Sequence, residues 1–263
     1  MKVLHGAETW KRRVKYILLI IAICYFLLCF SQRLRVRDAA EGVGDCRLYY
    51  IVNVDGMKGL GHSILLLLNE QGEGTVLSFN GMQGTLGEAL LGRAGVGKLS
   101  VGRMNSSETA TFLNTGNLDL EGDQLDDNYD VALYRTITRE EYQAIMAEID
   151  PYIQAAENYE RLYALEAFST DADERAAYQA EMEQMGQDNS LPLYQLYTHN
   201  CDHAARAFAA AVDAEMDAYN AVSRHLTPNG NFKAFAGHAT DWGVLRLGES
   251  SLFESLLEFF MIF

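Results

Sequence analysis

The chain has 263 residues, of which 49% are hydrophobic, so it is long enough to bury the core of one medium domain or two small ones. The chain has 21 Lys and Arg residues and 36 Asp and Glu residues. Residues 1–37 contain eight of the basic residues and one of the acidic residues, so the remainder has 13 basic and 35 acidic residues and a net charge of −22. Because so acidic a body repels phosphate backbones and anionic head groups, we expect no nucleic-acid partner.

An uncharged apolar run near the N-terminus predicts insertion into a membrane. Residues 16–30 carry only aliphatic, aromatic and cysteine side chains, and basic residues flank the run on both sides. Its length lies between that of a signal-peptide core and the ~20 residues of a transmembrane helix. Three arginines follow within residues 33–37, where a cleavage site with small residues would be expected, and they favour an uncleaved anchor over a removed signal peptide.

We therefore predict a single-pass membrane protein in which residues 1–37 form the anchor and residues 16–32 contact the membrane. Basic residues are more numerous before the run than after it, which favours a cytoplasmic N-terminus and an extracytoplasmic domain. A removed signal peptide stays open as the alternative. A buried core helix is disfavoured, because no polar stripe interrupts the run at helical spacing.

The remainder of the chain begins with a pattern of strands. Residues 38–45 are small and polar with two glycines, which is typical of a linker, so we expect the domain to span residues 46–263. Residues 47–54 are rich in aromatic and β-branched side chains and predict a first strand. Residues 62–68 and 75–80 predict two further strands, joined as a hairpin by a glycine-containing turn. The second strand is apolar without alternation, so both of its faces are expected to be covered.

Helical patterns dominate the middle of the chain. Thr138 and Glu141 fit the Thr-x-x-Glu capping box that starts a helix, and apolar residues then recur at three-to-four spacing to about residue 163. Pro151 should kink or divide this helix. A second, more polar helical pattern follows, and we interpret residues 138–190 as a helical insertion or lid. The other expected elements are a helix at 173–185, strands at 129–135 and 242–247, and a short helical turn at 88–91.

The motif Asn200-Cys201-Asp202-His203 stands at the start of a run of strong helix formers, which predicts a helix over residues 201–214. Asn200 is a favourable N-cap and places Cys201 in the first helical turn. There the helix dipole and the unpaired backbone N–H groups favour a thiolate, the form in which cysteine attacks an acyl carbon. The same N–H groups can bind the oxyanion of a tetrahedral intermediate. One helix start can thus provide both nucleophile and oxyanion hole.

A second motif provides a candidate general base. Gly61-His62 opens the strand at 62–68, so the imidazole of His62 is expected at the edge of this strand and not inside the sheet. Its separation of 139 residues from Cys201 is no objection, because catalytic groups are recognised by geometry and not by sequence position. On the neighbouring strand Ser78 and Asn80 share one face, so either can orient the imidazole through its other nitrogen.

The order of these motifs resembles the circularly permuted papain-like superfamily, which includes permuted NlpC-type peptidases, lecithin:retinol acyltransferase-like proteins and PPPDE-type peptidases. In that superfamily a Gly-His begins one strand, a polar residue stands on the next, and an Asn-Cys later begins a helix. The resemblance covers roughly residues 46–80 and 190–215. It implies an α+β domain in which an antiparallel sheet packs on the cysteine-bearing helix, here with the helical insertion and an N-terminal transmembrane helix added.

The resemblance also implies roles for individual residues. His62 corresponds to the base, Cys201 to the nucleophile, and Ser78, or alternatively Asn80, to the polar third position, where many members have histidine. The implied function is a membrane-anchored cysteine hydrolase that cleaves amide bonds, in cell-envelope peptides if the domain faces outward. An acyltransferase or lipid-ester hydrolase of the same fold, acting on an acyl substrate, stays open. So does a non-catalytic envelope or binding protein on the same scaffold.

Alternatives for the cysteine motif also stay open. Cys201 could be a small buried hydrophobe, or it could pair with Cys46 in a disulfide, which would block thiol chemistry. A zinc site at His199, Cys201 and His203 is disfavoured, because this spacing across a loop-to-helix boundary does not converge readily. We therefore expect no metal and no cofactor. The residues expected to line a substrate cleft are Tyr197, His199, Asn200 and Asp202.

Overall fold

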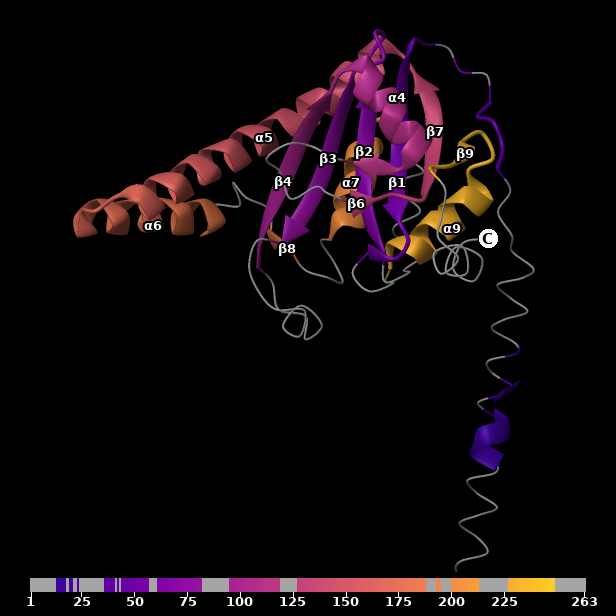
Figure 1. The fold of residues 1–263 in the computed structure, drawn as a ribbon, viewed down its shortest axis with the longest axis horizontal. Coiled ribbons are helices and arrows are strands. Elements are labelled where there is room, and N and C mark those ends of the chain that lie inside the picture. The colour runs from indigo at the N-terminus through magenta and orange to yellow at the C-terminus, as the bar shows by residue number, and fades with distance from the viewer. Residues whose placement is uncertain are drawn as a thin grey trace, which may run out of the picture.

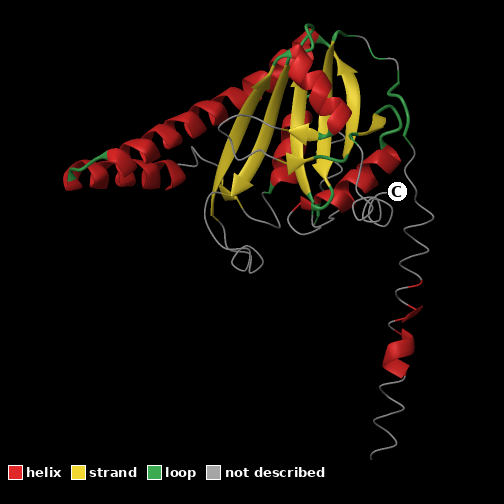
Figure 2. Cartoon of the chain, viewed as in Figure 1, coloured by secondary structure: helices red, strands yellow, loops and turns green. Residues whose placement is uncertain are grey.

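The computed structural model shows an α+β fold built on one large antiparallel sheet (Figure 1 and Figure 2). Within the described residues, seven strands form this sheet in the order β8-β4-β3-β2-β1-β7-β9, and every neighbouring pair is antiparallel. The residues that the structure describes are 13–17, 19, 20, 23, 36–40, 42, 44–56, 61–81, 95–118, 127–187, 193–194, 200–212 and 227–248.

Three strands at the centre of the sheet occupy the positions that the sequence predicts: β1 (Cys46–Asn53), β2 (His62–Leu68) and β3 (Gly74–Gly81). All seven residues of β2 are buried, which confirms that both faces of this strand are covered. Because side chains alternate along a strand, neighbouring residues of β2 contribute to different hydrophobic cores on the two faces of the sheet.

One face of the sheet, called the α4 face below, is covered by α4 (Ser106–Thr115), which follows β4 (Gly95–Met104). Neither element is predicted from the sequence. The signal for the helix is a second capping box: the Asn105 side chain accepts hydrogen bonds from the backbone N–H of Ser107 and Glu108, and the Glu108 carboxylate accepts one from the Asn105 N–H.

The opposite face, called the α7 face below, is covered by α5 (Arg139–Phe168), α7 (Cys201–Ala209) and α9 (Pro228–His238). In Figure 1, α4 lies in front of the sheet, and α7 lies behind it. Helix α9 is not among the elements expected from the sequence. Thr227 caps this helix by accepting a hydrogen bond from Gly230 N–H, and proline suits its first position because no N–H is needed there.

Helix α5 and its partner α6 (Ala172–Gln187) form the helical insertion, and Figure 1 shows the pair projecting well beyond the sheet. The capping box of Thr138 and Glu141 is confirmed. Pro151, however, does not divide the helix, which runs unbroken for 30 residues. The proline and Ala147, whose carbonyl would otherwise accept its hydrogen bond, are both exposed, so water can solvate that carbonyl.

Three of the remaining strands extend the large sheet on its two sides, and the other two pair with each other in a separate small sheet. The expected strands at 129–135 and 242–247 are found with slightly shifted bounds, whereas the expected turn at 88–91 lies outside the described residues. These strands are β5 (Asn117–Leu118), β6 (Asp127–Asn128), β7 (Val131–Ile137), β8 (Leu193–Tyr194) and β9 (Gly243–Arg246).

The segment that precedes the first strand contacts the domain directly. Arg37 forms a β-bridge with Val244 of β9 through two backbone hydrogen bonds of 3.1 and 2.8 Å. Its guanidinium donates to the carbonyls of Ala236, Ala239 and Trp242, at 2.7–2.8 Å, at and just beyond the C-terminus of α9. The ordered fold therefore includes residues that the sequence analysis assigns to the anchor and the linker.

The N-terminal transmembrane helix in the expected fold is not found. Within the described residues no helix is both long enough and apolar enough to cross a membrane. Most of the apolar run at 16–30 lies outside the described residues.

Replacing Arg37 with alanine should lower the free energy of unfolding by about 2–3 kcal/mol, because three charge-assisted hydrogen bonds at the negative end of a helix are lost. Urea denaturation followed by circular dichroism measures the change. Arg103→Ala, at an exposed position of β4, is the matched control and should change stability by less than about 0.5 kcal/mol. Equal stabilities of the two variants would contradict the role given to Arg37.

Candidate functional site

The start of α7 has the cap that the sequence predicts. Asn200 has extended backbone angles, and its side-chain oxygen accepts hydrogen bonds from the backbone N–H of His203, at 3.1 Å, and from His203 Nδ1, at 2.8 Å. Cys201 is therefore the first residue of the helix. The Asn200 side chain, expected to line a substrate cleft, is instead used as the helix cap and is buried.

The Cys201 thiol is enclosed, with only 2% of the residue exposed. Burial raises the pKa of this thiol from 9.0 to about 11; the Asp202 carboxylate adds to the rise, and hydrogen bonding to the backbone of Ser63 opposes it. The helix start was expected to favour the thiolate, but desolvation outweighs that effect here. Cys201 is accordingly a neutral thiol at physiological pH.

His62 lies next to the polar residues predicted for it on β3. Its Nε2 shares a hydrogen bond of 3.0 Å with Ser78 Oγ, and Asn80 Nδ2 donates to the same oxygen at 3.0 Å. Ser78 pairs with Ile64, so it stands diagonally across from His62 on the same face of the sheet. His62 and Ser78 are both buried, and the His62 ring lies 6.4 Å from the ring of Tyr129. The imidazole is thus held in one place by its neighbours.

The side chains of Cys201 and His62 lie on opposite faces of the sheet. The contacts of His62 with Ser78 and Tyr129 are on the α4 face, where Tyr129 belongs to the core. The thiol of Cys201 contacts Ser63, which alternation places on the α7 face. The two candidate catalytic residues therefore come from adjoining parts of the fold, because Ser63 directly follows His62, but their side chains point to different sides of β2.

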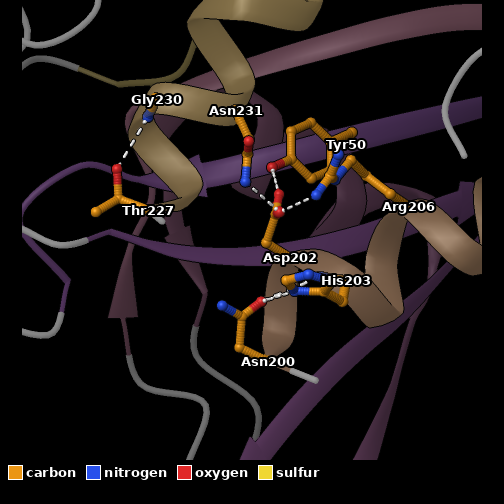
Figure 3. A network of polar contacts seen from close by, with 8 residues as sticks. All are labelled: Tyr50, Asn200, Asp202, His203, Arg206, Thr227, Gly230 and Asn231. Carbon is orange, nitrogen blue, oxygen red and sulfur yellow. Dashed lines mark hydrogen bonds and ion pairs between the residues drawn. The ribbon is translucent and has the colours of Figure 1, made fainter. Parts of the chain in front are cut away.

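Asp202 is the centre of a buried polar network (Figure 3). Its carboxylate accepts hydrogen bonds from the Tyr50 hydroxyl, from Arg206 Nη2 at 2.6 Å and from Asn231 Nδ2 at 2.6 Å. Asp202, one of the residues expected to line a substrate cleft, is 0% exposed. The network joins β1, α7 and α9.

Several residues of this site are absent from the sequence-based candidates. The spacing of Asp202 and Arg206, four residues apart on one helix, is a signal that could have predicted their ion pair. Ser63 could have been found from its position beside His62. Tyr50 and Asn231 carry no such signal, because only the tertiary fold brings them to Asp202.

The structure resolves the disulfide alternative for the cysteines. Cys46 and Cys201 are both free thiols, so no disulfide joins them. In the part of the chain that the structure describes, no cluster of three or more His, Cys, Asp or Glu residues is suited to hold a metal ion. Tyr197 and His199, two of the expected cleft residues, lie outside the described residues.

Comparison of the chain with protein-family models, with curated proteins and with solved structures gave no significant match. The resemblance to the permuted papain-like superfamily therefore stays a prediction that rests on the motifs and their order.

Alkylation of Cys201 by iodoacetamide at pH 7 should be about a hundredfold slower than that of a thiol with a pKa of 9.0, since the thiolate fraction falls about tenfold for each unit of pKa. The rate should still be rising at pH 10. Peptide mass spectrometry over a range of pH measures it, and Cys201→Ala confirms the assignment of the modified peptide. A plateau below pH 9 would contradict the raised pKa.

Proposed function

We propose that this protein is a cysteine hydrolase that cleaves amide bonds, with Cys201 as the nucleophile and His62 as its general base. The observation that carries the proposal is the meeting of two chain segments: the first residue of α7 contacts Ser63, the residue that follows His62 at the start of β2. The order of the motifs, similar to that of the permuted papain-like superfamily, supports the same assignment.

The contacts of His62 suit the role of a base. The Ser78 oxygen has two lone pairs, and it accepts one hydrogen bond from Asn80. If it accepts the other from His62 Nε2–H, the nitrogen without a proton is Nδ1, which is then able to take the proton of a thiol. In this arrangement Ser78 orients the imidazole, and Asn80 orients Ser78.

The reaction would proceed in two stages. Transfer of the Cys201 proton to His62 gives a thiolate that attacks the amide carbonyl; the amine then leaves with that proton, and a thioester remains on the sulfur. Water next attacks the thioester and releases the acid and the free thiol. Backbone N–H groups in the first turn of α7 are the donors available to the developing oxyanion.

Catalysis on this scaffold requires a change of side-chain arrangement. The imidazole and the thiol start on opposite faces of β2, and the thiol is almost fully buried. The His62 ring must therefore move around the end of β2, or the start of α7 must shift, before a proton can pass between them. Such a requirement is compatible with an enzyme whose site is assembled when substrate binds.

The same observations favour a second candidate function, a non-catalytic binding protein on a papain-like scaffold. A thiol with 2% exposure and a pKa of about 11 is what a cysteine retained only for packing would show. An acyltransferase or lipid-ester hydrolase shares the chemistry of the first candidate and differs from it in substrate.

Trapping of a covalent acyl intermediate separates these functions. The full-length protein is incubated with peptide p-nitroanilides and with p-nitrophenyl esters of short and long acyl chains, and intact-mass spectrometry detects the adduct. We expect an acyl group on Cys201 that is absent from Cys201→Ala. His62→Ala should lower the rate of acylation by about a hundredfold or more.

Cys46→Ala is the matched control and should keep the full rate. Cys46 is also a buried free thiol, but it is the first residue of β1, whereas His62 pairs with the last residue of that strand, Asn53. Preference for the long-chain esters would favour the lipid-ester alternative. If the folded protein acquires no adduct from any reporter, the enzymatic proposal fails and the non-catalytic function is preferred.

A further inference from the structure

The first turn of α9 lies beside both halves of the candidate site. Figure 3 shows Asn231, from this turn, directed at the Asp202 carboxylate at the start of α7. Thr227 closes the turn by accepting a hydrogen bond from Gly230 N–H at 3.2 Å. Asn229 and Asn231 are both buried, at 0% and 3% exposure, although asparagine is usually a surface residue. Two buried amides in one helical turn call for a structural or functional reason.

Asn231 fixes the start of the cysteine helix. Its Nδ2 donates to Asp202 Oδ2 at 2.6 Å, and Asp202 directly follows Cys201 in the chain. The aromatic ring next to Asn231, that of Phe232, stacks on Tyr50 at 6.0 Å, and the Tyr50 hydroxyl is another donor to Asp202. Helix α9 therefore contacts the Asp202 carboxylate directly and, through Tyr50, indirectly.

Asn229 fixes the start of the histidine strand. Its Nδ2 donates to the carbonyl of Val54, just beyond β1, at 2.9 Å. It also packs against Gly61, whose φ is +90° and where an added Cβ would lie only 2.4 Å from Asn229 Oδ1. Glycine is required at that position by its φ and by this contact together. The residue that precedes His62 is thus placed by the same turn of α9.

We propose that Asn231 is a positioning residue for the Cys201 thiol, acting through Asp202, and that Asn229 places the start of the strand that carries His62. The inference rests on the proposed function, because it gives the turn of α9 the task of setting the two catalytic segments relative to each other.

The charges around the thiol determine the expected effect of losing Asn231. Among the described residues, the charged and titratable groups that face this region are Asp202 and Arg206 of α7 and Tyr50 of β1, whereas β2 contributes the uncharged Ser63. Burial raises the pKa of Tyr50 well above its ordinary value, so it stays a neutral donor. Without the Asn231 amide, the Asp202 charge is less well compensated and disfavours the neighbouring thiolate more strongly.

The test is the pH profile of Cys201 alkylation by iodoacetamide in the full-length protein. Asn231→Ala should move the midpoint upward and slow the reaction at pH 9 about threefold to tenfold. Tyr50→Phe removes another donor to the same carboxylate and should shift the midpoint in the same direction. Asp202→Asn removes the charge itself and should shift it downward by about one unit, provided that this variant folds.

Asn105→Ala, which removes the cap of α4 on the far face of the sheet, is the matched control and should leave the midpoint unchanged. A merely structural role for Asn231 predicts a different result: loosened packing would expose the thiol and speed alkylation at every pH. Faster alkylation of Asn231→Ala, or an unshifted midpoint in this variant, would overturn the inference.

The acylation assay keeps this inference separate from the proposed function. If the wild-type protein forms no acyl adduct but Asn231→Ala shifts the alkylation midpoint, the positioning of the thiol stands and the hydrolase proposal fails. If the wild type and Asn231→Ala are acylated equally fast and have the same midpoint, the hydrolase proposal stands and the positioning role fails.

Discussion

The constraint on which the rest of the structure depends is the burial of β2 on both faces. A strand made almost entirely of aliphatic residues must be shielded from water on each side, and the chain meets this requirement with α4 on one face and α5, α7 and α9 on the other. Consecutive residues at the start of this strand consequently enter different environments. His62 contacts Ser78 and Tyr129, whereas Ser63 contacts the Cys201 thiol.

The polar network around Asp202 buries an ion pair, Asp202–Arg206, whose hydrogen bonding is incomplete. Asp202 is fully satisfied by three donors, but Arg206 Nε and Nη1 have no hydrogen-bond partner among the described residues. A buried pair of this kind seldom adds stability over an apolar replacement, although removing one partner alone costs several kcal/mol. We expect the pair to contribute specificity instead, because it favours one orientation of α7 against β1 and α9.

Much of the local structure follows from the sequence, whereas the relation between the two faces does not. The bounds of β2, the capping box at Thr138 and the cap at Asn200 are set by neighbouring residues, and all three are found as expected. The start of α9 was missed, since Pro-Asn-Gly is typical of turns as well as of helix starts.

Alternation along β2 places the side chains of His62 and Ser63 on different faces of the sheet. Which of these faces α7 packs against depends on contacts between distant segments. The pKa of Cys201 shows the same limit. The helix start, read from the sequence, favours a thiolate, while the burial that reverses this effect appears only in the tertiary structure. The β-bridge of Arg37 also affects the order in which parts of the sheet can form. Its guanidinium binds the Trp242 carbonyl across 205 residues of chain, so the sheet edge at β9 closes only after nearly all of the chain is available, long after the local β2–β3 hairpin can pair.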